Sequence, residues 1–110
     1  MRLVYLAGPY RDARGEYFVG QNIRAAASIA IELWRLGYAV ITPHLNTAFF
    51  GGACPDEVWL EGDLVMMRRC DFVVLVPGWD KSSGTRAEVA EARRLGIPVC
   101  EWPAVPEAGR

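Results

Sequence analysis

The sequence has few of the residues that build metal sites and disulfide frameworks. Its 110 residues include one histidine, His44, and three cysteines, Cys54, Cys70 and Cys100. The cysteines lie 16 and 30 residues apart and form no C-x-x-C pair. Since zinc sites and redox centres usually contain such closely spaced ligands, we expect free thiols in a reducing compartment and no bound metal.

The sequence also has no excess of one charge and no long apolar run. Twelve Lys and Arg residues balance thirteen Asp and Glu residues, giving a net charge of −1. No apolar run approaches the roughly 18 residues that a membrane span needs, and the N-terminal one is too short for a signal peptide. We therefore expect a cytoplasmic protein that binds neither nucleic acid nor a membrane.

Glycine-rich phosphate-binding motifs are missing as well. The segment 8–15 does not match G-x-G-x-x-G, and G-x-x-x-x-G-K-[ST] occurs nowhere. A dinucleotide cofactor and a P-loop nucleotide are therefore not predicted, and we expect no cofactor. Arg11 and Arg14 in the same segment fit two interpretations, which are a contact to a phosphate and an ordinary solvated surface position.

What the sequence does have is apolar segments, bounded by Gly and Pro, that alternate with helical patterns. This alternation predicts βα units and a parallel sheet. The expected strands are 3–7, 38–42, 71–76 and 97–101, and the expected helices are 16–36, 56–69 and 85–95. The apolar stripe of the first helix consists of Ile23, Ala26, Ala27, Ala30, Leu33 and Trp34. One α/β domain over 1–101 and an irregular tail over 102–110 follow from this pattern.

The expected architecture is an open three-layer αβα sheet of the flavodoxin or Rossmann-like type, with strand order 2-1-3-4. In such sheets ligands bind at the carboxyl ends of the strands, beside the point where the strand order reverses. The loops that begin at Gly8 and Pro77 should therefore face each other across a cleft.

Two carboxylates and the histidine are candidates for chemistry. Asp63 lies within the apolar stripe of its helix, where desolvation would raise its pKa; an acid catalyst and a buried structural acid both fit. Glu88 follows the third strand, but Thr85 and Glu88 also form a T-x-x-E capping box in which Glu88 would only bind backbone. His44 fits a catalytic base or a group that stabilises its loop.

In these residues the chain resembles the nucleoside 2-deoxyribosyltransferase-like superfamily, which includes deoxynucleoside 5′-monophosphate N-glycosidases and a small, little-characterised branch. The likeness spans residues 3–101. It rests on Val4-Tyr5-Leu6-Ala7-Gly8-Pro9, on Asp63 before Cys70-Asp71-Phe72-Val73-Val74, on Ser82-Ser83-Gly84-Thr85-Arg86-Ala87-Glu88, and on residues 92–99.

The resemblance implies a catalytic role for three residues. Glu88 would be the nucleophile that attacks the anomeric carbon, Tyr5 would orient its carboxylate, and Asp63 would handle the proton or the base. It further implies that Ser82 stands where the monophosphate glycosidases carry a serine, which favours hydrolysis and a phosphate near Ser82, Gly84 and Arg11.

The expected function is therefore cleavage of the N-glycosidic bond of a nucleoside or deoxynucleoside, or of its 5′-monophosphate, by hydrolysis or by transfer. Gly8, Arg11, His44, Ser82 and Gly84 are the expected substrate-binding residues. A non-catalytic nucleotide-binding module of the same fold is the main alternative, and an interaction domain with exposed Trp59, Trp79 and Trp102 is another. We also expect a homodimer or a higher homo-oligomer.

Overall fold

The computed structural model describes residues 1–106 as four strands and four α-helices. The strands are β1 (Leu3–Ala7), β2 (Ala39–Ile41), β3 (Phe72–Leu75) and β4 (Val99–Glu101); the helices are α1 (Glu16–Arg35), α2 (Pro43–Asn46), α3 (Asp56–Arg68) and α4 (Ser83–Arg94), with a 3-10 turn, η1, at Trp79–Lys81. None of these helices is long and apolar enough to cross a membrane.

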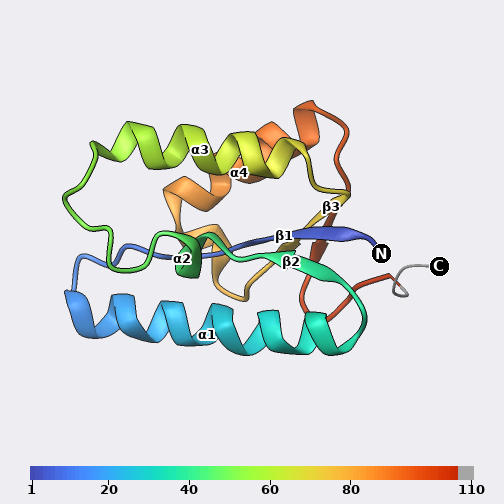
Figure 1. Ribbon diagram of the computed structural model, residues 1–110, viewed down its shortest axis with the longest axis horizontal. Coiled ribbons are helices and arrows are strands. Elements are labelled where there is room, and N and C mark those ends of the chain that lie inside the picture. Colours follow the sequence, from blue (N-terminus) through green and yellow to red (C-terminus); the bar gives the residue numbers. More distant parts are fainter. Residues whose placement is uncertain (107–110) are drawn as a thin grey trace.

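The strands form one parallel sheet in the order β2-β1-β3-β4, which confirms the predicted fold class and strand order. Strand β1 is central: Tyr5 pairs with Ile41 of β2 on one side and with Val73 of β3 on the other. Helix α1 covers one face of the sheet, and α3 and α4 cover the opposite face (Figure 1).

Alternation along β1 divides the core into two clusters. Val4 and Leu6 point toward α1, where they pack with Ala26 and Leu33. Tyr5 and Ala7 belong to the other cluster, which includes residues of α3 and α4. Because successive side chains of a strand point to opposite faces, the tyrosine is directed into the layer that carries both candidate carboxylates.

The predicted elements need four corrections. Helix α4 begins at Ser83 rather than Thr85, because Ser82 is the residue that caps it. Proline 43 does not simply end β2 but starts the short helix α2, since proline suits a first helical position. The turn η1 lies within the expected loop at 77–84. In α1 the buried stripe includes Ile29, and Trp34 is 52% exposed.

The chain after β4 packs against the α1 side of the sheet. Trp102 and Val105 lie against the first core cluster, and the Tyr38 hydroxyl donates to the carbonyl of Pro106. The remaining part of the expected tail, 107–110, lies outside the described residues.

Gly8 brings the carboxyl ends of β1 and β3 together. The amide of Val76 donates to the carbonyl of Ala7 at 2.8 Å. A Cβ added at Gly8 would lie 2.6 Å from the Cβ of Val76 and 2.7 Å from its Cγ2, closer than van der Waals contact permits. Glycine is therefore required here by the close approach of the two chain segments.

We expect Gly8→Ala to lower the free energy of unfolding by about 1–3 kcal/mol, because the added methyl group forces the two strand ends apart. Urea denaturation followed by circular dichroism measures this change. The matched control is Gly62→Ala on α3, where an added Cβ meets nothing within 4 Å; better helix propensity should raise stability there by up to about 1 kcal/mol. A Gly8→Ala protein as stable as the wild type would contradict the close-approach argument.

Candidate active site

The centre of the candidate site is a hydrogen bond from strand β1 to helix α4. The Tyr5 hydroxyl donates to Oε2 of Glu88, over a separation of 83 residues in sequence. Tyr5 is fully buried and Glu88 is largely buried. The tyrosine therefore holds the carboxylate in one position at the sheet surface.

Glu88 is available for this contact because it does not cap its helix. Ser82 is the N-cap: its Oγ accepts from the backbone amide of Thr85 at 3.2 Å and from the Thr85 hydroxyl at 3.0 Å. Glu88 lies one further turn into the helix, too far along to bind its first amides. The capping-box interpretation of Thr85 and Glu88 is therefore wrong.

Burial makes Glu88 an unusually weak acid. Desolvation raises the pKa of its carboxyl from 4.5 to about 7, since the charged form is the one that burial penalises. The hydrogen bond from Tyr5 opposes this increase because it stabilises the carboxylate, and the nearby charge of Asp63 contributes a smaller part of the increase. The pKa of Tyr5 is raised by burial and by the charges of Glu88 and Asp63, so its hydroxyl stays protonated as a donor.

Asp63 brings a second perturbed carboxyl to the same place from α3. It is partly buried, and desolvation raises its pKa from 3.8 to about 6. Its charge acts on the pKa of both Tyr5 and Glu88. The sequence argument for a desolvated acid in the apolar stripe agrees with this position, because Met67, one turn on, is buried in the core cluster that contains Tyr5.

His44 is bound to backbone. It is 4% exposed, and its Nε2 lies 2.8 Å from the carbonyl oxygen of Pro9. Burial lowers the pKa of the imidazole, so the neutral ring donates from Nε2 and leaves Nδ1 buried without a partner. His44 thereby joins the start of α2 to the loop after β1, in agreement with the loop-stabilising alternative.

The other expected substrate-binding residues are placed as follows. Arg11 is 72% exposed and forms an ion pair at 2.5 Å with Asp56, at the start of α3. Ser82 accepts both bonds from Thr85, so its own hydroxyl proton remains to be donated. Gly84 lies exposed in the first turn of α4, with only the Ser82 Oγ near its missing Cβ. The structure thus brings Tyr5, Asp63 and Glu88 together.

Two contacts that support the site were not identified from the sequence. Trp79 donates from Nε1 to Oε1 of Glu101 at 2.9 Å, and Arg86 donates to the carbonyl of Asp80 at 2.7 Å. Both hold the loop that leads to Ser82. No local sequence pattern indicates the Trp79 contact, because its partner is 22 residues away in β4.

Within 1–106, no cluster of three His, Cys, Asp or Glu side chains is arranged to hold a metal ion. Cys54, Cys70 and Cys100 are free thiols. Burial raises the pKa of the Cys70 thiol to about 11, so this sulfur is a poor nucleophile at neutral pH. What the arrangement offers chemically is a pair of weakly acidic carboxyls, one of which, Glu88, is held by a tyrosine.

We expect stability to fall with rising pH because of Glu88. Its pKa is higher in the folded state than in the unfolded one, so the folded state binds more protons between pH 4.5 and 7. Its contribution is complete below 4.5 and is lost as the pH passes through about 7, a change of about 3 kcal/mol. The raised pKa of Asp63 also lowers stability with rising pH, between pH 3.8 and about 6. Urea denaturation at several pH values measures the loss.

Glu88→Gln should flatten this pH dependence above pH 6, because the amide does not titrate. Glu91→Gln on the same helix is the matched control, since ion pairing with Arg94 lowers the pKa of Glu91 to about 2. The stability that Glu91 contributes is present above pH 4.5 and is lost only as the pH falls toward 2. Equal slopes in wild type and Glu88→Gln between pH 6 and 7.5 would rule out the raised pKa.

Comparison with known proteins supports the fold. The structure is similar to that of a 2-deoxyribosyltransferase from Bacillus psychrosaccharolyticus, with a TM-score of 0.67 and 20% identity over 94% of this chain and 77% of that one. It is also similar to a conserved protein from Enterococcus faecalis V583, with a TM-score of 0.66 and 19% identity over 92% of this chain and 62% of that one.

No curated protein matches the sequence. A family model described as a domain of unknown function, DUF4406, matches residues 2–101, almost the whole chain. The chain is therefore a member of the DUF4406 family, with the fold of the 2-deoxyribosyltransferase-like proteins.

Proposed function

We propose that this chain cleaves the N-glycosidic bond of a nucleoside, a deoxynucleoside or a 5′-monophosphate of either, with Glu88 as the nucleophile. The observation that carries the proposal is the convergence of Tyr5, Asp63 and Glu88 from three elements. The fold likeness to an enzyme that transfers deoxyribose supports the substrate class.

The first step forms a glycosyl ester. The ionised Glu88 carboxylate attacks C1′, the bond from C1′ to the base nitrogen breaks, and its electron pair leaves with the base. Asp63 in its protonated form gives its proton to the departing base. Charge that develops on the sugar is stabilised by the carboxylate beside it, as in glycoside cleavage.

The second step releases the sugar. Water attacks C1′, Asp63 accepts a proton from that water, and the Glu88 carboxylate leaves with the electrons of the ester bond. An acceptor base in place of water would give transfer rather than hydrolysis. Tyr5 holds Glu88 in line with C1′ in both steps and supplies no proton to the products.

The proposed substrate contacts use the loops around this centre. Gly8 lets the end of β1 lie against Val76, which brings the loops after β1 and β3 together at the site. The free hydroxyl proton of Ser82 suits a sugar or phosphate oxygen. Gly84 allows close approach at the first turn of α4. Arg11 would have to exchange its exposed ion pair with Asp56 for a phosphate, and His44 positions the loop that carries Arg11.

The reaction requires one proton on the Asp63 and Glu88 pair. With pKa values of about 6 for Asp63 and about 7 for Glu88, the singly protonated pair is most abundant between pH 6 and 7. In most of these molecules the proton is on Glu88, and the smaller fraction with the proton on Asp63 and an ionised Glu88 is the form that reacts. We expect kcat/KM to follow a bell-shaped pH profile with limbs near 6 and 7. Tyr5→Phe should move the upper limb to higher pH, because the bond that stabilises the Glu88 carboxylate is lost. A wild-type rate that is constant from pH 5 to 9 would contradict this scheme.

The direct test is chromatographic detection of free base after incubation with ribonucleosides, deoxyribonucleosides and their 5′-monophosphates. We expect release by the wild type, at least a 10³-fold loss in Glu88→Gln, and roughly a 10²-fold loss in Asp63→Asn. Glu91→Gln, one turn along α4 and paired with Arg68 and Arg94, should keep the wild-type rate.

Two results would overturn the proposal. One is equal activity in wild type and Glu88→Gln. The other is a folded wild type that releases base from no member of the panel. In the second case, thermal stabilisation by a nucleotide, unchanged in Glu88→Gln, would establish the alternative of a non-catalytic nucleotide-binding module.

A further inference from the structure

Helix α3 carries a tryptophan that faces inward but is not part of the core. Trp59 lies one turn before Asp63, so the two side chains share a face of the helix. That face is the inward one, because Trp59 and Asp63 are half-buried and Met67 is buried, whereas residues 60–62 are exposed. Among residues 1–106, neither core cluster includes Trp59, although Met67 belongs to one of them.

Trp59 lies between the entrance of the candidate site and its acid. Arg11, in the loop after β1, pairs with Asp56, the first residue of α3, so this end of the helix lies at the carboxyl edge of the sheet. Asp63, two turns along, is close enough to Tyr5 to act on its pKa. Since side chains of a helix tilt toward its N-terminus, the Asp63 carboxyl leans toward the turn that carries Trp59. A molecule that approaches Asp63 from this edge therefore meets the indole ring.

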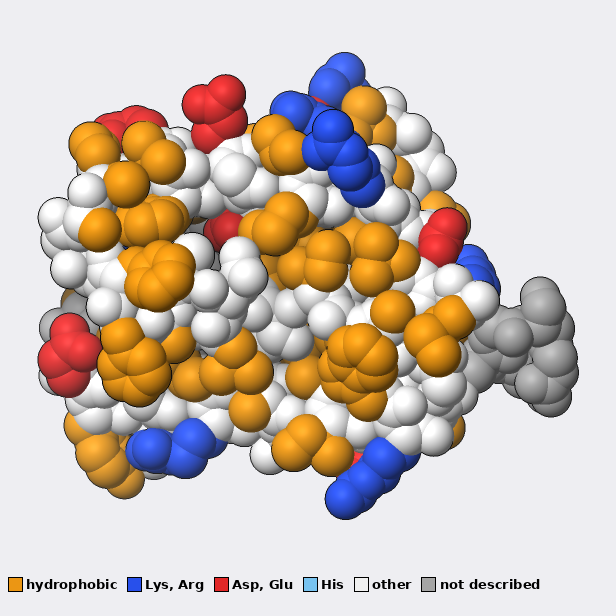
Figure 2. Space-filling view, in the orientation of Figure 1, with side chains coloured by type: hydrophobic (Ala, Val, Ile, Leu, Met, Phe, Trp, Pro, Cys, Tyr) orange, Lys and Arg blue, Asp and Glu red, His pale blue; other side chains and the backbone are white. Residues whose placement is uncertain are grey.

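Phe50, in the loop 47–55, gives Trp59 an aromatic neighbour. The two ring centroids are 6.3 Å apart, and the ring planes are inclined at 45°. The backbone of Phe50 is held on both sides, since its amide donates to Thr47 at 3.1 Å and its carbonyl accepts from Ala53 at 3.0 Å. Hydrophobic side chains gather at the end of the molecule where α3 begins (Figure 2). The aromatic pair is thus a built surface at the entrance of the site.

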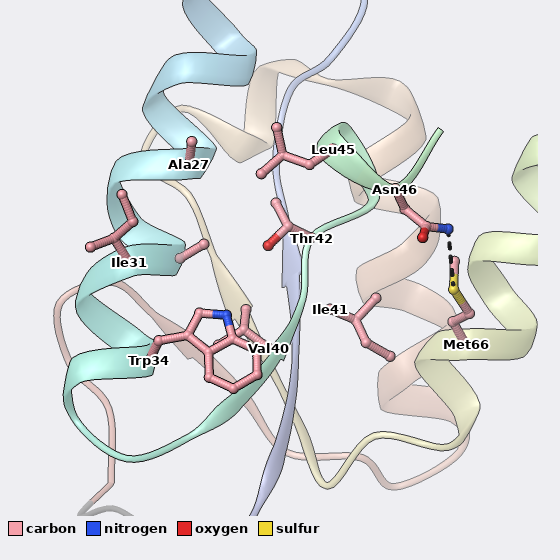
Figure 3. Close-up of a pocket in the computed structure, with 10 residues that line it drawn as sticks. Ala27, Ile31, Trp34, Val40, Ile41, Thr42, Leu45, Asn46 and Met66 are labelled. Atoms are coloured by element: carbon pink, nitrogen blue, oxygen red, sulfur yellow. Dashed lines mark hydrogen bonds between the residues drawn. The ribbon is translucent and has the colours of Figure 1, made fainter. Parts of the chain in front are cut away.

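The loop that carries Phe50 is joined to α3 at both ends. Asn46, at the end of α2, donates to Sδ of Met66 on α3 at 3.8 Å (Figure 3), and Pro55 leads directly into α3. Between these ends Phe49 has a φ of 70°, a left-handed conformation that bulky residues rarely adopt. The loop therefore accepts a strained turn beside the residue that contacts Trp59.

The proposed reaction places a flat ring next to Asp63. Asp63 gives its proton to the departing base, so the base has to lie within hydrogen-bond reach of this carboxyl. The faces of a nucleobase are planar and apolar, and proteins commonly bind them by stacking on aromatic side chains. Trp59, one turn from Asp63 on the same face of α3, has the required chemistry and the required place.

We propose that Trp59, backed by Phe50, is the surface on which the base of the substrate stacks, and that it thereby holds the base beside Asp63. The inference rests on the proposed function and adds to it the residues that bind the base. Because stacking grows with the overlap of the two ring systems, the indole ring favours the two-ring purines over the one-ring pyrimidines. Trp59 contacts the base but transfers no proton.

NMR of the indole N–H groups tests base binding without turnover. The chain has four tryptophans, and Trp59→Phe identifies the Trp59 signal by its absence. When ¹⁵N-labelled Glu88→Gln is titrated with deoxyadenosine, we expect the Trp59 signal to shift, because the ring current of a stacked base acts on it. The signals of Trp34 on α1 (Figure 3) and of Trp102 should stay in place, since both residues lie on the opposite face of the sheet.

Kinetics of base release test the same contact in the active chain. We expect Trp59→Ala to raise KM for deoxyadenosine by about 10- to 100-fold, the effect of losing one stacked base, with a smaller increase for deoxycytidine. The change in kcat should be smaller than the change in KM, and Trp59→Phe should recover most of the affinity. Trp34→Ala, which removes an indole ring that is 52% exposed on α1, is the matched control and should keep both parameters.

A second variant covers a failure to fold. Circular dichroism shows whether Trp59→Ala is folded. Trp59→Leu keeps an apolar side chain without an aromatic face, so it should raise KM as the alanine variant does and provides the test if that variant is unfolded.

The outcomes separate this inference from the proposed reaction. Base release with the same KM in wild type and folded Trp59→Leu, or a Trp59 signal that stays in place while a nucleoside binds, overturns the stacking surface and leaves the reaction standing. A shifted Trp59 signal without base release by the wild type supports the stacking surface and overturns the reaction. A panel of nucleosides and 5′-monophosphates that neither shifts an indole signal nor releases base overturns both.

Discussion

The hydrogen bond from Tyr5 to Glu88 is the interaction on which the candidate site depends. It joins the central strand to the helix that follows β3, and it exists because alternation along β1 directs the tyrosine into the α3 and α4 layer. A buried carboxylate is costly without a partner, and one donor lowers that cost without neutralising the group. The result is a carboxyl that titrates near neutrality, at a fixed place beside a second one.

Three structural contacts supply this geometry. Gly8 lets the end of β1 lie against Val76, which places the loops after β1 and β3 side by side. Ser82 caps α4 and thereby leaves Glu88 free one turn later. His44 in α2 binds the carbonyl of Pro9 and so holds the loop that follows β1. Residues whose immediate role is structural thus determine what the carboxylates can do.

The sequence predicts the fold better than it predicts the site. Apolar segments bounded by Gly and Pro specify the strands, and right-handed crossovers then restrict their order. The prediction of a cap at Thr85 was wrong because two neighbouring residues, Ser82 and Thr85, are both suited to cap a helix. The cap is Ser82, since α4 begins at Ser83 in the folded chain. The exposure of Trp34 and the contact of His44 with Pro9 depend on segments far away in sequence, so periodicity along one helix cannot reveal them.

The measurement that tests this account most directly is the pKa of the Glu88 carboxyl, obtained by NMR of protein labelled with ¹³C at the glutamate carboxyls. Glu88→Gln identifies the resonance, because that signal disappears from its spectrum. The account predicts a midpoint near 7 in the wild type. A midpoint near the ordinary value of 4.5 would contradict it, because the carboxyl would then be solvated and not buried beside Tyr5.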